Sequence, residues 1–311
     1  MPGNLWHSLA YLGMMAQASE DAFMPYAQSQ GARIYYEETG KGAPILFIHE
    51  FGGDHRSWDD QVRYFGRGWR CIAWGARGYP PSDCPEDEKL YGQDFFNRDA
   101  IAVLDAARVA KAHVVGLSMG GYTALMLAAK FPERVISCTA AGAGSGALKE
   151  TRAKFIDDAR ARAAAFERAG KIDAEATGVG PTRVQLLNKD PVGWHRFVKH
   201  LAEHPAHAAA KTQRNVQVGR ASLYDLEAEL KAIKAPVLLL VGDEDEPCLD
   251  VNLWMKRLMP TARLAFLPGA GHAINLEEPA LFNQLTEQFL GEVSRGSWRP
   301  RDARATPLLR K

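Results

Sequence analysis

Ser118 stands in the most chemically specific motif of the chain, Gly116-Leu117-Ser118-Met119-Gly120. The motif follows the apolar pair Val114-Val115 and precedes an amphipathic stretch, so it occupies a strand-to-helix turn. A G-x-S-x-G sequence at such a turn holds its serine in a strained conformation with the hydroxyl exposed, and its glycines allow close backbone approach. The pattern predicts that Ser118 is a nucleophile at the N-terminus of a helix, where the helix dipole favours negative charge.

A serine hydroxyl needs a general base to take its proton, and the base needs an acid to orient it. His272 lies in the glycine-rich segment Gly269-Ala270-Gly271-His272, just after an apolar run, and is the predicted base. The acid is expected at the end of another strand, between nucleophile and base in chain order. Asp245 meets this condition and is the predicted acid, with Asp243 as its rival in the same acidic turn.

Two further features complete the predicted site. The backbone N–H groups of Phe51 and Met119 are expected to converge on one substrate oxygen and form an oxyanion hole. Glu50, Trp194 and Phe197 are predicted to contact the substrate, although the two aromatic residues could instead pack within their own helical segment.

Alternating strands and helices must position these residues. Seven apolar runs have the length and composition of strands: Ala32–Glu38, Pro44–His49, Arg70–Trp74, His113–Leu117, Val135–Ala141, Pro236–Gly242 and Ala262–Leu267. Between them lie amphipathic patterns typical of helices: Ser57–Phe65, Asp94–Val109, Met119–Phe131, Leu249–Met259 and Pro279–Val293. This alternation predicts an α/β fold with a mostly parallel, doubly wound sheet.

The alternation breaks once, where strand patterns are absent and helical ones such as Thr151–Ala169 and Pro191–Ala210 take over. We therefore predict a core of residues 32–145 and 233–293 with a helical cap, residues 146–232, inserted between two strands. Residues 1–31 are predicted to form an N-terminal arm, helical over Met1–Ala22. The basic tail, residues 294–311, is expected to be solvated and loosely ordered, or else to reach a neighbouring subunit in a homodimer.

Composition excludes several classes of function. The chain has 311 residues, 24% charged, and a net charge of +1, without the basic excess that nucleic-acid or membrane-surface binding favours. It has no apolar run of about 18 residues, as a membrane span would require. Four widely spaced cysteines, without a C-x-x-C pair, favour a reducing, cytoplasmic compartment. No nucleotide, flavin or metal motif is present, so we expect a small-molecule substrate and neither cofactor nor metal.

Together these motifs resemble the α/β-hydrolase family, in particular its cap-bearing serine esterase and lactonase branch. The resemblance covers about residues 32–293 and includes the His49 loop, the segment Arg77-Gly78-Tyr79-Pro80-Pro81-Ser82, and the Ser118, Asp245 and His272 motifs. The family usually has glycine after the loop histidine, where this chain has Glu50. That carboxylate is expected to lie near the site entrance or to pair with Arg77, a residue that in the family generally braces loops.

The resemblance implies hydrolysis of a carboxylic ester or lactone by a Ser-His-Asp triad through an acyl-enzyme intermediate. Serine at the elbow argues against dehalogenase and epoxide hydrolase chemistry, which use a carboxylate there. Three alternatives share the same residues: hydrolysis of a carbon–carbon bond in aromatic degradation, cofactor-free perhydrolysis, and ligand sensing by a receptor of this fold.

Overall fold

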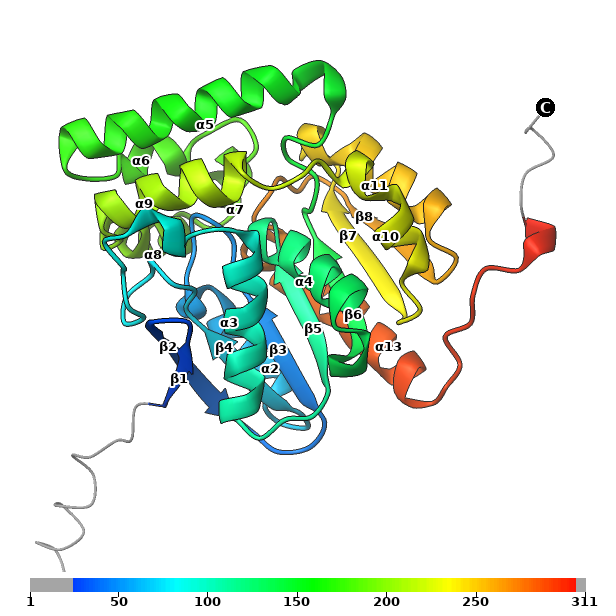
Figure 1. The fold of residues 1–311 in the computed structure, drawn as a ribbon. Coiled ribbons are helices and arrows are strands. Elements are labelled where there is room, and N and C mark those ends of the chain that lie inside the picture. Colours follow the sequence, from blue (N-terminus) through cyan, green and yellow to red (C-terminus); the bar gives the residue numbers. More distant parts are fainter. Residues whose placement is uncertain (1–24, 306–311) are drawn as a thin grey trace, which may run out of the picture.

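An eight-stranded sheet forms the centre of the molecule in the computed structural model, which describes residues 25–305. Its strand order is β1-β2-β4-β3-β5-β6-β7-β8; β1 and β2 are antiparallel and the others parallel (Figure 1). The strands are β1 (Tyr26–Ser29), β2 (Ala32–Thr39), β3 (Pro44–Ile48), β4 (Arg70–Trp74), β5 (Ala112–Leu117), β6 (Val135–Ala141), β7 (Val237–Gly242) and β8 (Ala262–Leu267). The predicted fold class is confirmed.

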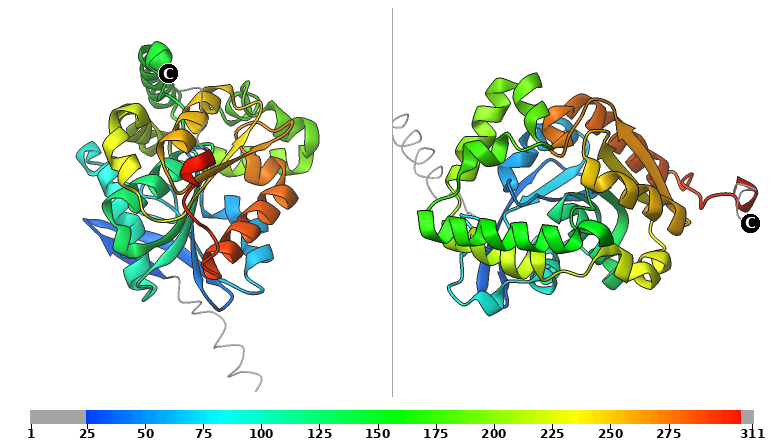
Figure 2. Two further views of the ribbon diagram at one scale, coloured as in Figure 1. Left: turned by 90° about the vertical axis from the view of Figure 1, so that its right-hand side faces the viewer. Right: turned by 90° about the horizontal axis from the view of Figure 1, so that it is seen from above.

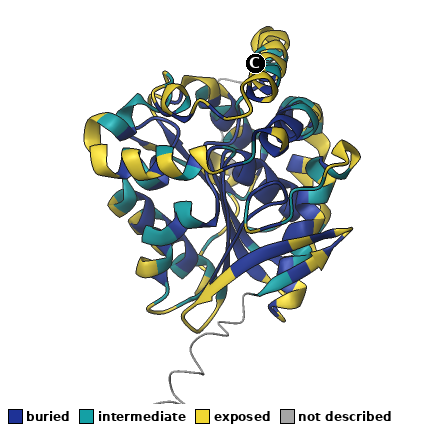
Figure 3. Ribbon diagram, turned by 90° about the vertical axis from the view of Figure 1, so that its left-hand side faces the viewer, coloured by how far each residue is buried: buried dark blue, intermediate teal, exposed yellow. Residues whose placement is uncertain are grey.

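Helices cover both faces of this sheet, which explains why its central strands are continuously apolar. Successive residues point to opposite faces: Val114 of β5 belongs to one apolar cluster and Val115 to the other. Figure 3 shows the buried strands between helices whose outer surfaces are exposed.

The first cluster includes residues of α3 (Gln93–Ala106), α4 (Met119–Lys130), α10 (Glu227–Ala232) and α11 (Glu246–Leu258). The second includes residues of α2 (Asp59–Phe65) and α13 (Pro279–Ser294). Short helices η1 (His55–Trp58), η2 (Glu88–Leu90), η3 (Pro132–Arg134), η5 (Leu223–Leu226) and α12 (Ile274–Glu277) connect these elements.

A separate group of helices lies between β6 and η5, at one end of the sheet (Figure 1). It comprises α5 (Lys149–Ala169), α6 (Ala174–Gly178), α7 (Val184–Lys189), α8 (Pro191–Ala202), α9 (Ala206–Thr212) and the π-helical turn η4 (Gln213–Val218). From above, the long helix α5 crosses the molecule along one side of this group (Figure 2). This group, α5 to η4, is called the cap below, and it has an apolar core of its own, which includes Phe166 and Leu201.

One predicted cap helix is interrupted. The segment Pro191–Ala210 was expected to be continuous, but α8 ends at Ala202 and α9 begins at Ala206. Pro205 separates them, because proline removes a backbone donor and disfavours helical geometry in the residue before it.

The two ends of the chain also differ from expectation. Residues 26–29 of the predicted arm form β1, which pairs with β2 from Tyr26↔Tyr35 to Ser29↔Ala32; residues 1–24 of the arm lie outside the described residues. The expectation of a loose tail is wrong for its first part, which leads to η6 (Ala303–Ala305). Trp298 packs on Phe289 with ring centroids 4.6 Å apart, and the Arg301 guanidinium donates to two carbonyls at the end of α11. No helix in residues 25–305 is long and apolar enough to cross a membrane.

Candidate active site

Ser118 occupies the sharp turn between β5 and α4. Its backbone has φ 55° and ψ −111°, a region that non-glycine residues rarely adopt. A Cβ on Gly120 would collide with the Ile48 carbonyl oxygen, and one on Gly116 would collide with the Gly120 carbonyl oxygen. The two glycines are therefore required for a turn this tight, and the turn sets the serine above the carboxyl end of the sheet.

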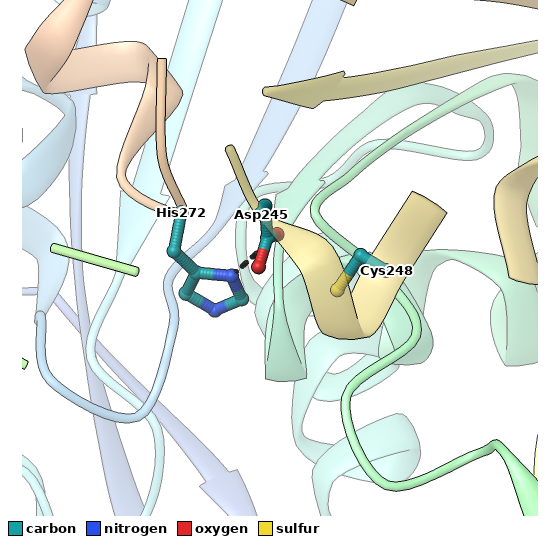
Figure 4. A group of neighbouring side chains, drawn as sticks. All are labelled: Asp245, Cys248 and His272. Carbon is teal, nitrogen blue, oxygen red and sulfur yellow. Dashed lines mark hydrogen bonds and ion pairs between the residues drawn. The ribbon is translucent and has the colours of Figure 1, made fainter. Parts of the chain in front are cut away.

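His272 and Asp245 form a buried pair at the ends of two neighbouring strands. The imidazole Nδ1 lies 2.7 Å from Oδ2 of Asp245 (Figure 4). Burial opposes protonation of the ring, but the Asp245 carboxylate outweighs it and raises the pKa of His272 above its ordinary value of 6.5. Asp243, the rival candidate for the acid, is exposed and instead accepts a hydrogen bond from the Ala270 N–H at 3.2 Å. Of the two, Asp245 contacts the histidine.

The histidine loop is fixed by two groups that the sequence did not single out. Glu277 accepts hydrogen bonds from the N–H groups of Gly271 and Ala273 on either side of His272. The Thr182 carbonyl, between α6 and α7, accepts the N–H of His272 itself at 2.6 Å. The helical cap thus holds the histidine loop directly. Glu277 belongs to the His272 motif, and that motif was the only feature of the sequence that could have pointed to it. Thr182 acts through its backbone carbonyl, so its residue type could not have pointed to this role.

The two N–H groups predicted to form an oxyanion hole are without hydrogen-bond partners in residues 25–305. Phe51 follows β3, Met119 is the first residue of α4, and neither N–H donates a hydrogen bond within the described part of the chain. An unsatisfied N–H is expected at Met119, in the first turn of α4, whereas Phe51 lies in the loop after β3.

A cavity of about 880 Å³ brings Ser118, His272 and Phe51 together beneath the cap helices. The cap contributes apolar side chains to its wall and several polar ones, in particular Leu148, Phe155, Arg162, Phe166, Gln213 and Gln217. Phe51 and Phe166 stack across the cap–core boundary at 6.4 Å.

The three residues predicted to contact substrate do not line this cavity. Phe197 is buried in the cap's own apolar core, and Trp194 packs against that core while its indole N–H donates to the Gly178 carbonyl at 2.9 Å. Apolar side chains of a small helical insert are needed to hold it together, so the alternative of internal packing applies to both.

Glu50 forms a buried ion pair across the boundary between core and cap. Its carboxylate oxygens accept two hydrogen bonds from the Arg183 guanidinium, and the glutamate side chain is 1% exposed. Burial opposes ionisation of Glu50, but Arg183 outweighs it and lowers the pKa of the carboxyl. The suggested pairing with Arg77 is wrong, because Arg77 pairs with Asp99 at 2.6 Å and braces neighbouring loops through the carbonyls of Leu90 and Ser29.

Asp245, Cys248 and His272 place potential metal ligands within 4.8 Å of one another (Figure 4). The donor set does not suit a resident metal. The carboxylate and the imidazole Nδ1 already bind each other, and burial raises the pKa of the Cys248 thiol well above its ordinary value, so the sulfur stays protonated.

Comparison with known proteins identifies the family of the chain. The family model described as "alpha/beta hydrolase fold" matches residues 43–279. The chain belongs to this family. It is 27% identical over 272 residues to 3-oxoadipate enol-lactonase 1 of Acinetobacter baylyi, covering 85% of this chain and 95% of the relative. It is 29% identical over 277 residues to 2-hydroxy-6-oxo-6-phenylhexa-2,4-dienoate hydrolase of Burkholderia cepacia, covering 83% and 91%.

A solved structure shows the same fold. The enol-lactonase from Burkholderia xenovorans LB400 superposes with a TM-score of 0.72 at 22% identity, covering 86% of this chain and all of that one, 100%.

Proposed function

We propose that this α/β hydrolase cleaves a carboxylic ester or lactone through an acyl-enzyme intermediate on Ser118. One observation carries the proposal. A strained serine at a strand-to-helix turn opens into the same cavity as a histidine whose Nδ1 is held 2.7 Å from a buried aspartate. This is the combination of nucleophile, base and orienting acid that acyl transfer requires.

In the first half-reaction the Ser118 Oγ attacks the substrate carbonyl carbon while Nε2 of His272 takes the hydroxyl proton. The carbonyl oxygen becomes an oxyanion, which the N–H groups of Phe51 and Met119 stabilise. One such donor contributes about 3 kcal/mol to transition-state stabilisation in comparable sites. Asp245 fixes the imidazole tautomer and stabilises the imidazolium. The proton then passes to the leaving oxygen, which departs as an alcohol or remains tethered when a lactone opens.

In the second half-reaction water replaces the alcohol. His272 takes a proton from the water, the hydroxide attacks the acyl carbon, and the Ser118–acyl bond breaks with return of the proton to Oγ. The products are the free acid and the free enzyme, and neither half-reaction uses a cofactor.

The cavity supports a small-molecule substrate with an apolar part. Leu148, Phe155 and Phe166 offer apolar surface in the same cavity as Ser118. The similarity to an enol-lactonase supports a lactone as one form of that substrate.

Carbon–carbon bond hydrolysis is the second candidate. It is favoured by the 29% identity to 2-hydroxy-6-oxo-6-phenylhexa-2,4-dienoate hydrolase. The same residues would serve, with carbon as the leaving atom in place of oxygen.

The test is hydrolysis of p-nitrophenyl esters from C2 to C12 and of a simple lactone by wild type, Ser118→Ala and Ser297→Ala. We expect turnover by wild type and by the remote serine variant, loss in Ser118→Ala, and equal melting temperatures for all three. Full activity of Ser118→Ala would refute the role of the serine. Absence of turnover by wild type on every ester and lactone would favour carbon–carbon hydrolysis or ligand sensing.

A further inference from the structure

One turn of the cap contacts both loops that carry the proposed catalytic groups. Residues 180–183, with the sequence Gly-Pro-Thr-Arg, lie between α6 and α7. The Arg183 N–H donates to the Gly180 carbonyl at 2.8 Å, which closes the turn. Proline in the second position fixes one backbone angle of a turn of this kind. We call these four residues the cap turn, and its conformation is restricted by its own sequence.

The backbone of the cap turn holds the loop of the catalytic base. The Thr182 carbonyl accepts the N–H of His272 at 2.6 Å. A Cβ on Gly271 would collide with the same carbonyl oxygen, so a larger residue there would push the cap turn and the histidine loop apart. The position of the base therefore depends on where the cap turn lies.

The Arg183 side chain holds the loop of the predicted oxyanion donor. Its Nη1 and Nη2 donate to the two carboxylate oxygens of Glu50, Nη1 at 2.7 Å. Glu50 and Phe51 share the peptide group whose N–H is the predicted donor. The carbonyl of that group accepts a hydrogen bond of 2.6 Å from Nδ1 of His49, because Nε2 of the same ring accepts the Ala76 N–H and so carries no proton. Glu50 is thus fixed at both its side chain and its carbonyl, and this sets the direction of the Phe51 N–H.

The contact between Arg183 and Glu50 is directional as well as charged. A guanidinium that meets both oxygens of a carboxylate fixes their relative orientation, which a point charge would not do. Burial opposes the charge of Arg183, but nearby carboxylates, first of all Glu50, outweigh it and raise the pKa of the guanidinium. The Arg183 side chain is 13% exposed, so water competes little for the carboxylate. The pair therefore transmits the position of the cap turn to the loop that carries Phe51.

We propose that Arg183 is a positioning residue, which sets the oxyanion donor of Phe51 and the base His272 relative to each other through one turn of the cap. It acts through its neighbours: its side chain holds Glu50, and the carbonyl of the preceding residue holds the histidine loop. This role rests on the proposed hydrolysis at Ser118. Misplacement of a catalytic group by about 1 Å can lower a rate about 10²-fold, so loss of the Arg183 guanidinium should reduce kcat by roughly that factor.

The test combines turnover of an ester with the rate at which diisopropyl fluorophosphate modifies Ser118, measured by mass spectrometry on the full chain. In that modification the Ser118 oxygen displaces fluoride from phosphorus while His272 takes the hydroxyl proton, so it needs the same groups as acyl transfer. We expect Arg183→Met to lower kcat and the modification rate about 10²-fold, with KM within about threefold of wild type.

The decisive variant is Glu50→Gln/Arg183→Met, which removes both charges of the pair. Its melting temperature should be close to that of wild type, whereas kcat and the modification rate should stay as low as in Arg183→Met. A purely structural role predicts instead that activity returns with stability. The control Glu203→Gln breaks a different ion pair between cap and core, with Arg56 at 2.8 Å, and should keep wild-type rates, because Glu203 does not line the catalytic cavity.

Hydrogen exchange at the His272 amide, followed by NMR in protein labelled with ¹⁵N-histidine, gives a readout that does not depend on turnover. Exchange should be about tenfold faster in both Arg183 variants than in wild type and Glu203→Gln, because the cap turn no longer holds the histidine loop. Three results would overturn the positioning role: wild-type kcat in the double variant, unchanged exchange, or a rise in KM with kcat unchanged, which would make Arg183 a substrate-binding residue. The expected exchange, together with no modification of Ser118 and no turnover by wild type, would instead refute the proposed hydrolysis.

Discussion

Replacing Glu50 with glutamine removes one charge from a buried pair and keeps the shape of the side chain. The carboxylate is 1% exposed and the Arg183 side chain 13% exposed, so water can replace only a small part of the lost interaction. Removal of one partner from a buried ion pair costs about 3–5 kcal/mol, since the other charge is left uncompensated. Because the guanidinium keeps some contact with solvent, we expect the lower end, about 3 kcal/mol.

That free energy corresponds to a measurable change in melting temperature. With an unfolding entropy of about 2.1 cal/mol/K per residue, a chain of 311 residues loses roughly 1.5 °C per kcal/mol. Glu50→Gln should therefore melt about 5 °C below wild type at pH 7. The pKa of Glu50 is lowered in the folded state, so its stabilisation is present above the ordinary carboxyl pKa of 4.5 and is lost only as the pH falls through the folded value.

The assay is scanning calorimetry, or urea denaturation where heating is irreversible, with two control variants. Asp158→Asn breaks the exposed pair with Lys154 and should cost no more than about 0.5 kcal/mol. The double variant Glu50→Gln/Arg183→Met removes both charges and should recover most of the loss. A Glu50→Gln variant as stable as Asp158→Asn, or a double variant less stable than the single one, would refute the reasoning.

Three further results are expected. Asp245→Asn should lower kcat about 10⁴-fold by favouring the wrong imidazole tautomer, whereas Asp243→Asn should stay within about threefold of wild type in the same ester assay; equal losses would contradict the assignment of the acid. The acidic limb of the pH profile of kcat/KM should have its midpoint above pH 6.5, because His272 must be neutral to act as base and Asp245 raises its pKa. A midpoint below pH 6.5 would contradict the role of His272 as base. Glu50 also raises the pKa of His272, so Glu50→Gln should move this limb to lower pH. Trp298→Ala should lower the free energy of unfolding by about 2 kcal/mol in urea denaturation, because a half-buried indole loses its contact with Phe289. An unchanged midpoint would mean that the tail segment does not stabilise the core.

Much of the fold could be predicted because its signals are local. The continuous apolar run of β7 shows that both faces of this strand are covered. The glycines around Ser118 show a turn that larger residues would obstruct. Each depends on neighbours in the chain and on backbone sterics. Two expectations failed for different reasons. The break at Pro205 has a strong local signal, proline, that the prediction of one continuous helix overlooked. The packing of Trp298 has no local signal, because its partner Phe289 lies on α13.

The sequence by itself determined the family, the fold class and the candidate nucleophile and base. Strand-to-helix turns and hydrophobic periodicity depend on residues that are neighbours in the chain, so they can be recognised from the sequence. Only the tertiary structure decided which acidic residue of one turn meets His272, and that Glu50 binds Arg183, 133 positions away. It also decided that Arg220 is buried, with its Nη1 unpartnered among residues 25–305. Such pairings depend on how distant segments pack and on how much water the packing excludes. Neither can be predicted from a local sequence pattern.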